Sequence, residues 1–311
     1  MENELVSVVI PTYNRADCII QCVDSVLNSD YENVEVIVVD NCSTDNTLEL
    51  LAKYDSVDKV RIICLKENLM AAGGRNKGFE DAKGDYIMFL DSDNIIHKDM
   101  LSKMVETFHN VNNLGFAAPV SVQINQGMHV WTLGAFINLK NSIPINNGSG
   151  KKIDDIDSSQ RYYKTCYSPN CGMVSRKAYE IAGGFDEVYY IMYEEADFGY
   201  KVVQSGFEAV IDTHAITDHY SGMNSDQNDR LRKLGVDPAP RAYHFAKNRS
   251  IFMSRYAKGL DLVLFYLFWV HAFCIYYVLI ALKEKRADIA KAYFKGTWKG
   301  IGMTLFHRKG N

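Results

Sequence analysis

Apolar and polar residues follow one another in blocks over the first 95 positions, and each block has the length of a strand or a helix. Continuous apolar runs rich in β-branched residues predict buried strands, at 6–10, 34–39, 60–65 and 86–90. The stretches between them predict helices, at about 16–28, about 47–54 and a third that ends at Ala82. This alternation is typical of a parallel sheet with helices on both faces.

The pattern weakens after residue 95 and becomes informative again near residue 170. It predicts a helix near 98–110, strands near 116–124 and 131–139, and a polar loop over 141–160. Further along it predicts a helix over about 193–204 and a strand near 209–212. We therefore expect one α/β domain over 1–240, with halves 1–95 and 96–240, and a separate C-terminal region over 241–311.

Residues 262–282 form an apolar run of 21 residues whose one clearly ionisable member is His271. As a helix, this run is long enough to cross about 30 Å of hydrocarbon. Basic residues stand on both sides, so the asymmetry that orients a spanning helix is missing. Three interpretations stay open: a single membrane span, a helix or hairpin lying in the membrane interface, and a helix buried in a soluble protein or in a homo-oligomer contact.

The formal net charge of −4 conceals a split along the chain. Residues 241–311 hold 13 basic and three acidic residues, a net charge of +10, which leaves 21 basic and 35 acidic residues, or −14, in 1–240. An acidic body argues against nucleic-acid binding, and a basic end favours contact with an anionic surface. The composition also excludes a disordered tail, a collagen-like repeat and a disulfide-stapled mini-domain.

The cysteines and the N-terminus both favour a cytosolic body. Seven cysteines without a C-x-x-C pair fit a reducing compartment, and Cys18 and Cys22 lie four apart on a predicted helix, where we expect them to pack. The N-terminal sequence MENELVSVVIP is acidic and leads directly into a strand, unlike a signal peptide.

Polar residues gather where the predicted strands end, which is the ligand-binding edge of open α/β sheets. They are Thr12, Tyr13, Asn14, Asp40, Asn68, Asp91 and Asp93. In FLDSDN, two carboxylates just past a buried strand can share Mg²⁺ or Mn²⁺ together with substrate phosphates. The simpler alternative is a solvated turn with a helix cap. Asp40 fits either a base or ribose contact or a cap.

A second acidic cluster comprises Glu194, Glu195 and Asp197. On a helix, Glu194 and Asp197 share a face, and Glu195 points about 100° away. A carboxylate that accepts a proton from an attacking hydroxyl fits here, and an exposed helix face is the alternative. His214 and His219 follow the next strand, where lone histidines are usually ordinary polar residues. The chain lacks the glycine-rich signatures of Rossmann dehydrogenases and P-loop NTPases, since GGRNKGF at 73–79 matches neither.

Five ordered motifs together resemble the inverting glycosyltransferase family 2. They are PTYNR (11–15), DNCSTDNT (40–47), the stretch from Asn68 through GGRNKG to LDSDN (90–94), GGFDE (183–187) and EEADFGYK (194–201). The resemblance implies a GT-A fold, a Rossmann-like and mostly parallel α/β sheet, with 1–95 as the nucleotide-sugar half and 96–240 as the acceptor half. It also implies a nucleotide-sugar pocket, lined by Pro11, Thr12, Tyr13, Asn14, Asp40, Asn68, Arg75, Asn76, Asp91 and Ser92. Asp91 and Asp93 would hold the ribose and a diphosphate bound to Mn²⁺ or Mg²⁺.

The segment 183–201 is similar to the family pattern G-G-F-D-E followed by E-D-x-D-L-x-x-R, found in rhamnosyl- and galactofuranosyl-type members. There, the aspartate after the first glutamate is the general base. This chain has Glu195 at that place, Phe198 for the leucine and Lys201 for the arginine. The resemblance therefore assigns the base to Glu195, with Glu194 and Asp197 in reserve. It assigns a metal ligand to His219, which matches better than His214, and the aromatics that we expect to stack on sugars are Trp131, Tyr162, Tyr189 and Tyr190.

The resemblance and the basic, apolar end imply one activity. We expect a metal-dependent inverting hexosyl- or deoxyhexosyltransferase of polysaccharide biosynthesis, acting at the cytoplasmic face of the cell membrane. Its substrates would be a nucleotide-sugar donor and a hydroxyl of a glycan or lipid-linked saccharide, with 241–311 on the membrane. An inactive membrane-tethered scaffold that binds sugar nucleotides is one alternative. A sugar-phosphate nucleotidylyltransferase is another, although PTYNR lacks its glycine-rich basic signature.

Overall fold

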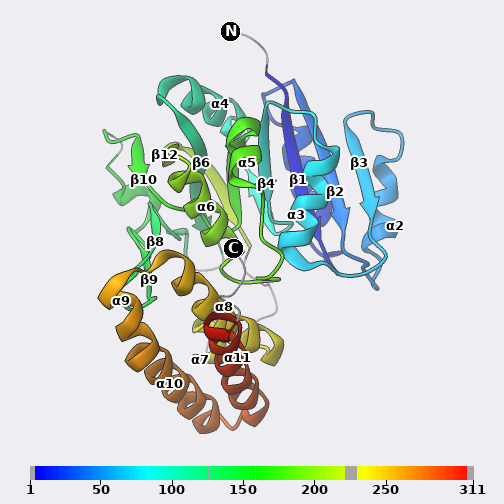
Figure 1. The fold of residues 1–311 in the computed structure, drawn as a ribbon. Coiled ribbons are helices and arrows are strands. Elements are labelled where there is room, and N and C mark those ends of the chain that lie inside the picture. The colour runs from blue at the N-terminus through cyan, green and yellow to red at the C-terminus, as the bar shows by residue number, and fades with distance from the viewer. Residues whose placement is uncertain (1–3, 125–126, 158, 221–229, 307–311) are drawn as a thin grey trace. The chain divides into compact units, whose positions relative to one another are not determined.

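The computed structural model describes residues 4–124, 127–157, 159–220 and 230–306 (Figure 1). The chain forms two compact units. The first unit comprises 1–136, 146–187 and 195–223, and the second comprises 137–145, 188–194 and 224–311. The division expected at residue 240 stays a prediction.

The first unit is built on a mixed sheet with the strand order β10-β12-β6-β11-β4-β1-β2-β3, to which β5 and β7 add short pairings. Strands β1 to β4 pair in parallel, as do β6 and β12, whereas β11 runs antiparallel to both β4 and β6. The mostly parallel sheet is therefore confirmed. The strands are β1 (Val6–Thr12), β2 (Val34–Asp40), β3 (Val60–Cys64), β4 (Tyr86–Leu90), β5 (Asn94–Ile96), β6 (Leu114–Gln123), β7 (His129–Val130), β10 (Tyr162–Lys164), β11 (Cys171–Ser175) and β12 (Glu208–His219).

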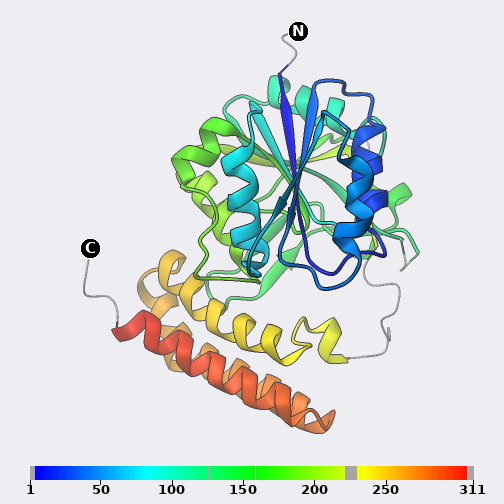
Figure 2. The same cartoon turned by 90° about the vertical axis from the view of Figure 1, so that its right-hand side faces the viewer.

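Helices cover both faces of this sheet (Figure 2). Residues of α1, α2 and α4 pack with Val8 and Ile10 of β1 on one face, and residues of α3, α5 and α6 pack with Val9 and Ile37 on the other. Alternate residues of a strand point to opposite faces, so a continuous apolar run supplies both cores. The helices are α1 (Ile19–Leu27), α2 (Thr47–Leu51), α3 (Met70–Asp81), α4 (Met100–Asn110), α5 (Arg176–Ala182) and α6 (Glu194–Gln204), with 3₁₀ turns at Ala52–Tyr54 and Ile153–Asp155.

The structure differs from the sequence-based expectation in the middle of the chain. The strand expected near 131–139 is shorter than expected, because only β8 (Ala135–Ile137) forms there, and it pairs with β9 (Pro144–Asn146) in a separate two-stranded sheet. Gly134 lies next to the carbonyl oxygen of Lys164, where a Cβ would come within 2.6 Å, and its φ of 154° lies outside the range of ordinary strand residues. β9 also interrupts the loop expected over 141–160. All seven cysteines are free thiols, and Cys22 is buried as expected.

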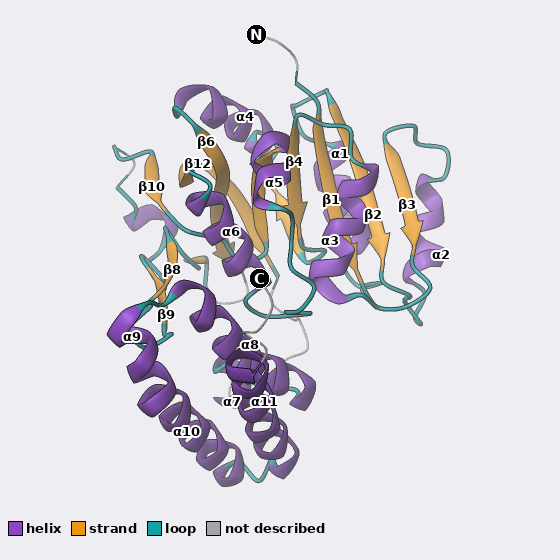
Figure 3. Cartoon of the chain, viewed as in Figure 1, coloured by secondary structure: helices purple, strands orange, loops and turns teal. Residues whose placement is uncertain are grey.

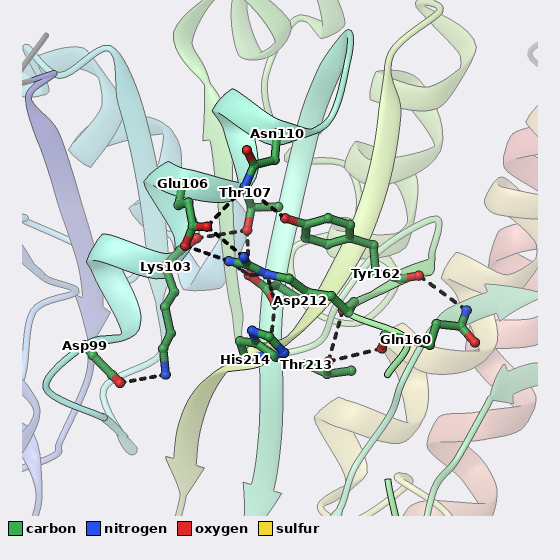
Figure 4. A network of polar contacts seen from close by, with 11 residues as sticks. Asp99, Lys103, Glu106, Thr107, Asn110, Gln160, Tyr162, Asp212, Thr213 and His214 are labelled. Carbon is green, nitrogen blue, oxygen red and sulfur yellow. Dashed lines mark hydrogen bonds and ion pairs between the residues drawn. The ribbon is translucent and has the colours of Figure 1, made fainter. Parts of the chain in front are cut away.

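A buried ion-pair network holds α4 against the edge of the sheet (Figure 4). Asp212 of β12 is fully buried and accepts hydrogen bonds from the Arg161 guanidinium at 3.0 Å and from the Thr107 hydroxyl at 2.6 Å. Arg161 also donates to Glu106 of α4 at 2.8 Å. The buried carboxylate is therefore paired and hydrogen-bonded, as a charge in the protein interior must be.

The second unit is helical (Figure 3). Its helices are α7 (Arg230–Lys233), α8 (Ala239–Tyr256), α9 (Gly259–Leu264), α10 (Val270–Lys283) and α11 (Ala287–Phe306), and a π-helical turn, Phe265–Trp269, joins α9 to α10. Helix α11 packs along α8 and α10. Gly296 and Gly300 permit the contact with α8, because a Cβ at Gly300 would come within 2.5 Å of the Lys247 carbonyl oxygen. Within the described residues, Gly259–Lys283 alone is long and apolar enough to cross a membrane, judged by length and composition.

Candidate active site

Two carboxylates follow β4 at the carboxyl end of the sheet, and each is held by an arginine. Arg75 donates to Oδ1 of Asp91 at 2.7 Å, and Arg15 donates to Oδ2 of Asp93 at 3.2 Å. The Asp93 side chain is only 14% exposed. The turn is therefore a partly buried ionic cluster, which argues against the simple solvated turn.

Arg75 of α3 connects this turn to α6. Its side chain is buried, and the nitrogen that binds Asp91 also donates to Oε1 of Glu195 at 2.7 Å. The same Glu195 oxygen accepts a hydrogen bond from the backbone nitrogen of Asn170 at 3.0 Å. Charge-assisted hydrogen bonds of this kind fix orientation as well as charge. The carboxylates expected to bind the donor and to act as the base thus share one buried cation.

Of the three carboxylates at the start of α6, Glu195 is the most accessible. Its side chain is 24% exposed, whereas Asp197 is fully buried and paired with Lys201 at 3.0 Å, and Glu194 is also buried. The alternative of an exposed helix face is therefore wrong for this segment. A base must reach the hydroxyl whose proton it accepts, so the geometry favours Glu195 over its two reserves.

His219, the last residue of β12, lies beside Asp93. Its Nε2 is 3.6 Å from Asp93 Oδ1, and its ring packs on Trp131 with centroids 4.7 Å apart. Burial lowers the pKa of His219 and raises the pKa of Asp93. His214, in contrast, is exposed, and its backbone nitrogen binds the Asp212 carboxylate of the edge network. His219 is therefore the histidine that lies next to the acidic turn.

Asp93 and His219 fit a divalent cation as two of its ligands. Ligands of one such ion lie about 3 Å apart, close to the separation of these two groups. Nδ1 of His219 is buried and makes no hydrogen bond within the described residues. The described part of the chain contains no group of three or more His, Cys, Asp and Glu residues arranged to hold a metal. Further ligands would therefore come from the substrate or from a reoriented Asp91.

The loops after β1 and β2 interlock beside a buried carboxylate. Asn14, with a φ of 52°, accepts a hydrogen bond from the Thr44 nitrogen at 2.7 Å. Asp40 is fully buried, and its Oδ2 accepts from the Ser43 nitrogen at 3.0 Å. Oδ1 of Asp40 and the hydroxyl of Thr12 are buried and have no hydrogen-bond partner within the described residues. Such groups normally find a partner, so this edge has capacity to bind a polar ligand.

Other residues expected in the nucleotide pocket have partners within the fold. The Asn76 amide accepts from the Tyr179 hydroxyl at 2.8 Å and donates to the Phe185 carbonyl at 2.9 Å, so it holds the GGFDE turn. The Asn68 side chain accepts from the Met70 nitrogen at 2.8 Å, at the start of α3. Arg75 binds Asp91 at 2.7 Å, and a role of Arg75 and Asn76 in the nucleotide pocket stays a prediction. Pro11 lies in β1, Ser92 is buried in the acidic turn, and Tyr13 is exposed.

Of the four aromatic residues expected to stack on sugars, burial excludes Tyr189, and stacking by the other three stays a prediction. Tyr189 is fully buried in the second unit. Tyr190 stacks on His244 at a centroid distance of 4.8 Å, and Tyr162 lies in the edge network near Asn110. Trp131 alone of the four packs on a residue of the candidate site.

Sequence reasoning missed several partners of the site. Arg15 stands within PTYNR, and the motif could have indicated it. Asn170 carries no local signal, because its role depends on the pairing of β11 with β4. Arg75, Asn170 and Glu195 also line a cavity of about 20 Å³ together with the rings of Phe89, Phe116, Phe185 and Phe198. Such a volume has room for about one water molecule.

Several curated proteins match parts of the chain. A putative teichuronic acid biosynthesis glycosyltransferase of Bacillus subtilis is 46% identical over 103 residues, 33% of this chain and 41% of that protein. A UDP-Glc:alpha-D-GlcNAc-diphosphoundecaprenol beta-1,3-glucosyltransferase of Escherichia coli is 47% identical over 92 residues, 29% of this chain and 36% of that protein. An amylovoran biosynthesis glycosyltransferase of Erwinia amylovora is 28% identical over 224 residues, 69% of each chain. The chain thus spans well under half of the first two relatives.

Solved structures with low sequence identity share the fold. GalNAc-T7 with UDP, GalNAc and Mn²⁺ matches with a TM-score of 0.65 at 14% identity, over 99% of this chain and 59% of that chain. The mannosyltransferase PcManGT of Pyrobaculum calidifontis, in complex with GDP-Man and Mn²⁺, gives 0.59 at 15% identity, over 96% of this chain and 87% of that chain. These likenesses confirm the GT-A fold. The model of the glycosyl transferase family 2 matches residues 7–181, more than half of the chain, and the protein therefore belongs to glycosyl transferase family 2.

Proposed function

We propose that the protein is a metal-dependent inverting glycosyltransferase that moves a sugar from a nucleoside-diphosphate sugar to a hydroxyl of a glycan or lipid-linked saccharide. The observation that carries this proposal is the Asp91–Arg75–Glu195 chain of hydrogen bonds at the carboxyl end of β4. It joins the acidic turn expected at the donor to a partly exposed carboxylate expected at the acceptor. The named relatives in polysaccharide biosynthesis support the same activity.

The donor would lie over the ends of β1, β2 and β4. Oδ1 of Asp40 and the Thr12 hydroxyl are buried polar atoms that a nucleoside can satisfy, and the exposed ring of Tyr13 can contact a base. The proposed lining is Pro11, Thr12, Tyr13, Asn14, Asp40, Asn68, Asp91 and Ser92. Without the Asp40 carboxylate, an N–H of the bound nucleoside would lose its hydrogen-bond partner. Polar sites reject ligands strongly when a buried polar group is left unpaired in this way.

Asp93 and His219, with Asp91 near them, would hold Mn²⁺ or Mg²⁺. A cation bound there would supply positive charge beside the diphosphate that leaves. The fit rests on the close approach of Asp93 and His219 and on the buried Nδ1 of His219. Two of the structural neighbours were solved with Mn²⁺.

Glu195 would act as the general base. Its carboxylate accepts the proton of the acceptor hydroxyl while the hydroxyl oxygen bonds to the anomeric carbon and the bond from that carbon to the diphosphate oxygen breaks. A single displacement inverts the anomeric configuration. Arg75 pairs with this carboxylate and orients it, and the Asn170 nitrogen binds the same oxygen.

The second unit would bind the cytoplasmic face of the membrane as an interfacial hairpin. Large apolar side chains on the α9–α10 helix are more than half exposed: Leu260, Leu267, Phe268, Ile275, Leu279 and Leu282. Helix α11 exposes Phe294 and Trp298 next to Lys291, Lys295 and Lys299, which recur once per turn. Three exposed lysines in the middle of α11 fit the headgroup region of anionic lipid better than a hydrocarbon core.

A donor panel in a thermal-shift experiment tests this proposal without an acceptor, because a bound donor raises the unfolding midpoint. We expect one of the UDP-, GDP- and dTDP-sugars to raise the midpoint in the presence of Mn²⁺, and Asp93→Ala to abolish the shift. Asp99→Ala, at an exposed surface pair with Lys103, is the matched control. The absence of a shift with every donor and both metals contradicts the proposal.

A further inference from the structure

The segment 188–193, which directly precedes α6, has an unusual backbone conformation. Three of its six residues, Tyr190, Met192 and Tyr193, have positive φ values of 66°, 68° and 73°. Non-glycine residues in this left-handed region persist where surrounding contacts impose the conformation, and they concentrate at functional sites. The contacts that impose the left-handed conformation here therefore matter for the position of the residues that follow the segment.

Asn248 of α8 supplies three of these contacts. Its side chain is fully buried, and its amide nitrogen lies 2.7 Å from the Tyr189 carbonyl oxygen, 2.8 Å from that of Ile191 and 2.7 Å from that of Met192. Three acceptors around one nitrogen identify it as the amide donor. A single side chain thus binds three backbone oxygens within four residues of the segment.

The two neighbours of Asn248 reach the same segment. The buried ammonium of Lys247 donates to the Val188 carbonyl at 2.6 Å, and the buried guanidinium of Arg249 donates to the Tyr193 hydroxyl at 3.4 Å. Arg249 also donates to the Tyr293 hydroxyl of α11 at 3.0 Å. Burying a charged or amide group is costly unless it binds a partner, and here all three groups bind the one segment. These contacts all lie within the second unit.

The chain then passes from Tyr193 into α6, whose second residue is Glu195. We propose that Asn248, supported by Lys247 and Arg249, is a positioning residue that fixes the backbone of Val188–Tyr193 and so aims the first turn of α6, which carries Glu195. This inference rests on the proposed function, because it assumes that Glu195 is the base. A small displacement of a reacting group costs turnover far more than it costs binding, since only the transition state needs the alignment.

Two kinds of variant test the proposal in the full-length protein. Asn248→Asp keeps the shape of the side chain but turns a donor into an acceptor that faces three carbonyl oxygens. Met192→Gly leaves every Asn248 contact in place but removes the side chain that restricts the backbone, and glycine accepts positive φ without strain. Thr297→Val is the matched control, because Thr297 is a buried polar residue of the same unit whose hydroxyl donates to the Tyr293 carbonyl of α11 and also contacts Cys274 of α10.

Hydrogen exchange and kinetics together give the readouts. We expect Asn248→Asp and Met192→Gly to speed amide exchange in peptides covering 188–196, and to lower kcat about tenfold or more while the donor KM changes less than about threefold. Thr297→Val should leave the exchange rate over 188–196, kcat and the donor KM unchanged. A role in folding alone predicts instead that Met192→Gly keeps full kcat. If Asn248→Asp fails to fold, Met192→Gly alone still tests whether the conformation of 188–193 controls turnover.

The proposal is overturned when folded Asn248→Asp or Met192→Gly keeps the wild-type exchange rate over 188–196 and the wild-type kcat. It is also overturned when Thr297→Val lowers kcat as much as they do. Failure of the proposed function looks different, because the wild type then releases no nucleoside diphosphate from any donor. The exchange of peptides 188–196 would still report whether Asn248 holds the segment.

Discussion

Arg75 donates a hydrogen bond of 2.7 Å to Glu195, 120 positions away along the chain. Because the same nitrogen also binds Asp91 at 2.7 Å, one buried cation fixes two carboxylates that come from different elements of the sheet. The orientation of the proposed base therefore depends on the acidic turn after β4. A substitution at Asp91 should therefore change the orientation of Glu195, and a substitution at Glu195 should change that of Asp91.

Removal of the Arg75 charge should lower both stability and turnover. Arg75→Met keeps the length of the side chain but leaves two carboxylates facing each other, and we expect a stability loss of about 1–3 kcal/mol, because both can still gain some solvent. We expect kcat to fall about 100-fold, since the base loses its orientation. Arg61→Met, at the partly exposed pair with Glu35, serves as the control and should cost less than about 1 kcal/mol. A wild-type kcat in Arg75→Met would refute the bridging role.

The network in Figure 4 should contribute to stability without contributing to chemistry. Arg161→Ala strips the fully buried Asp212 of its charged partner, and we expect a loss of about 3–5 kcal/mol in urea unfolding. Lys103→Ala, which breaks the exposed pair with Asp99 on the same helix, should cost about 0–1 kcal/mol. Equal losses in the two variants would show that the burial of Asp212 does not matter.

His244 should make the stability of the protein depend on pH. Burial, and then the charge of Lys247, lower the pKa of His244 to about 4, while its ring stacks on Tyr190. The unfolded chain binds the proton with a pKa of about 6.5, so this contribution to stability is complete above pH 6.5 and is lost as the pH falls toward 4.

Because the His244 side chain is partly exposed, we expect it to account for about 1 kcal/mol between pH 7 and pH 4.5. Thermal unfolding midpoints of the wild type and of His244→Gln across this range provide the measurement. The wild type should lose more stability on acidification than the variant does. Parallel curves for the two proteins would show that the histidine is not responsible.

The exposed apolar face of the second unit should govern membrane binding. Leu267→Glu combined with Leu279→Glu removes two large exposed apolar side chains, each worth about 1.5–3 kcal/mol when buried in lipid, and should weaken vesicle binding at least about tenfold. Flotation with anionic and with neutral vesicles measures the effect, and the anionic ones should bind more tightly. Ile181→Glu, at an exposed apolar residue of α5 in the first unit, should bind as the wild type does. Equal loss in Ile181→Glu would point to general insolubility.

The first four strands and their helices were predictable because their signal is local. Val8 to Ile10 and Ile37 to Val39 read as buried strands, since both faces of the sheet need apolar side chains. The carboxyl ends of those strands then place Asp40 and Asp91 at one edge without knowledge of any distant contact.

The partners that orient the site were not predictable, because they depend on tertiary contacts. Strand β11 inserts between β4 and β6 from 80 residues further along the chain, and this insertion brings Asn170 to Glu195. The burial of Asp197 and of Asn248 likewise depends on tertiary packing, so helical periodicity left a proton-accepting role and an exposed face both open for Asp197 and indicated nothing for Asn248.

The most direct test of the central claim is the kcat of Glu195→Gln with a donor that the thermal-shift panel identifies. The substitution keeps the size of the side chain and removes its ability to accept a proton. We predict that kcat falls about 10²–10⁴-fold while donor affinity stays within about threefold, and that Glu187→Gln, at an exposed carboxylate that binds the Asn76 amide, retains full activity. A kcat for Glu195→Gln close to that of the wild type would contradict the assignment, and a large loss in Glu194→Gln or Asp197→Asn alone would move the base to that residue.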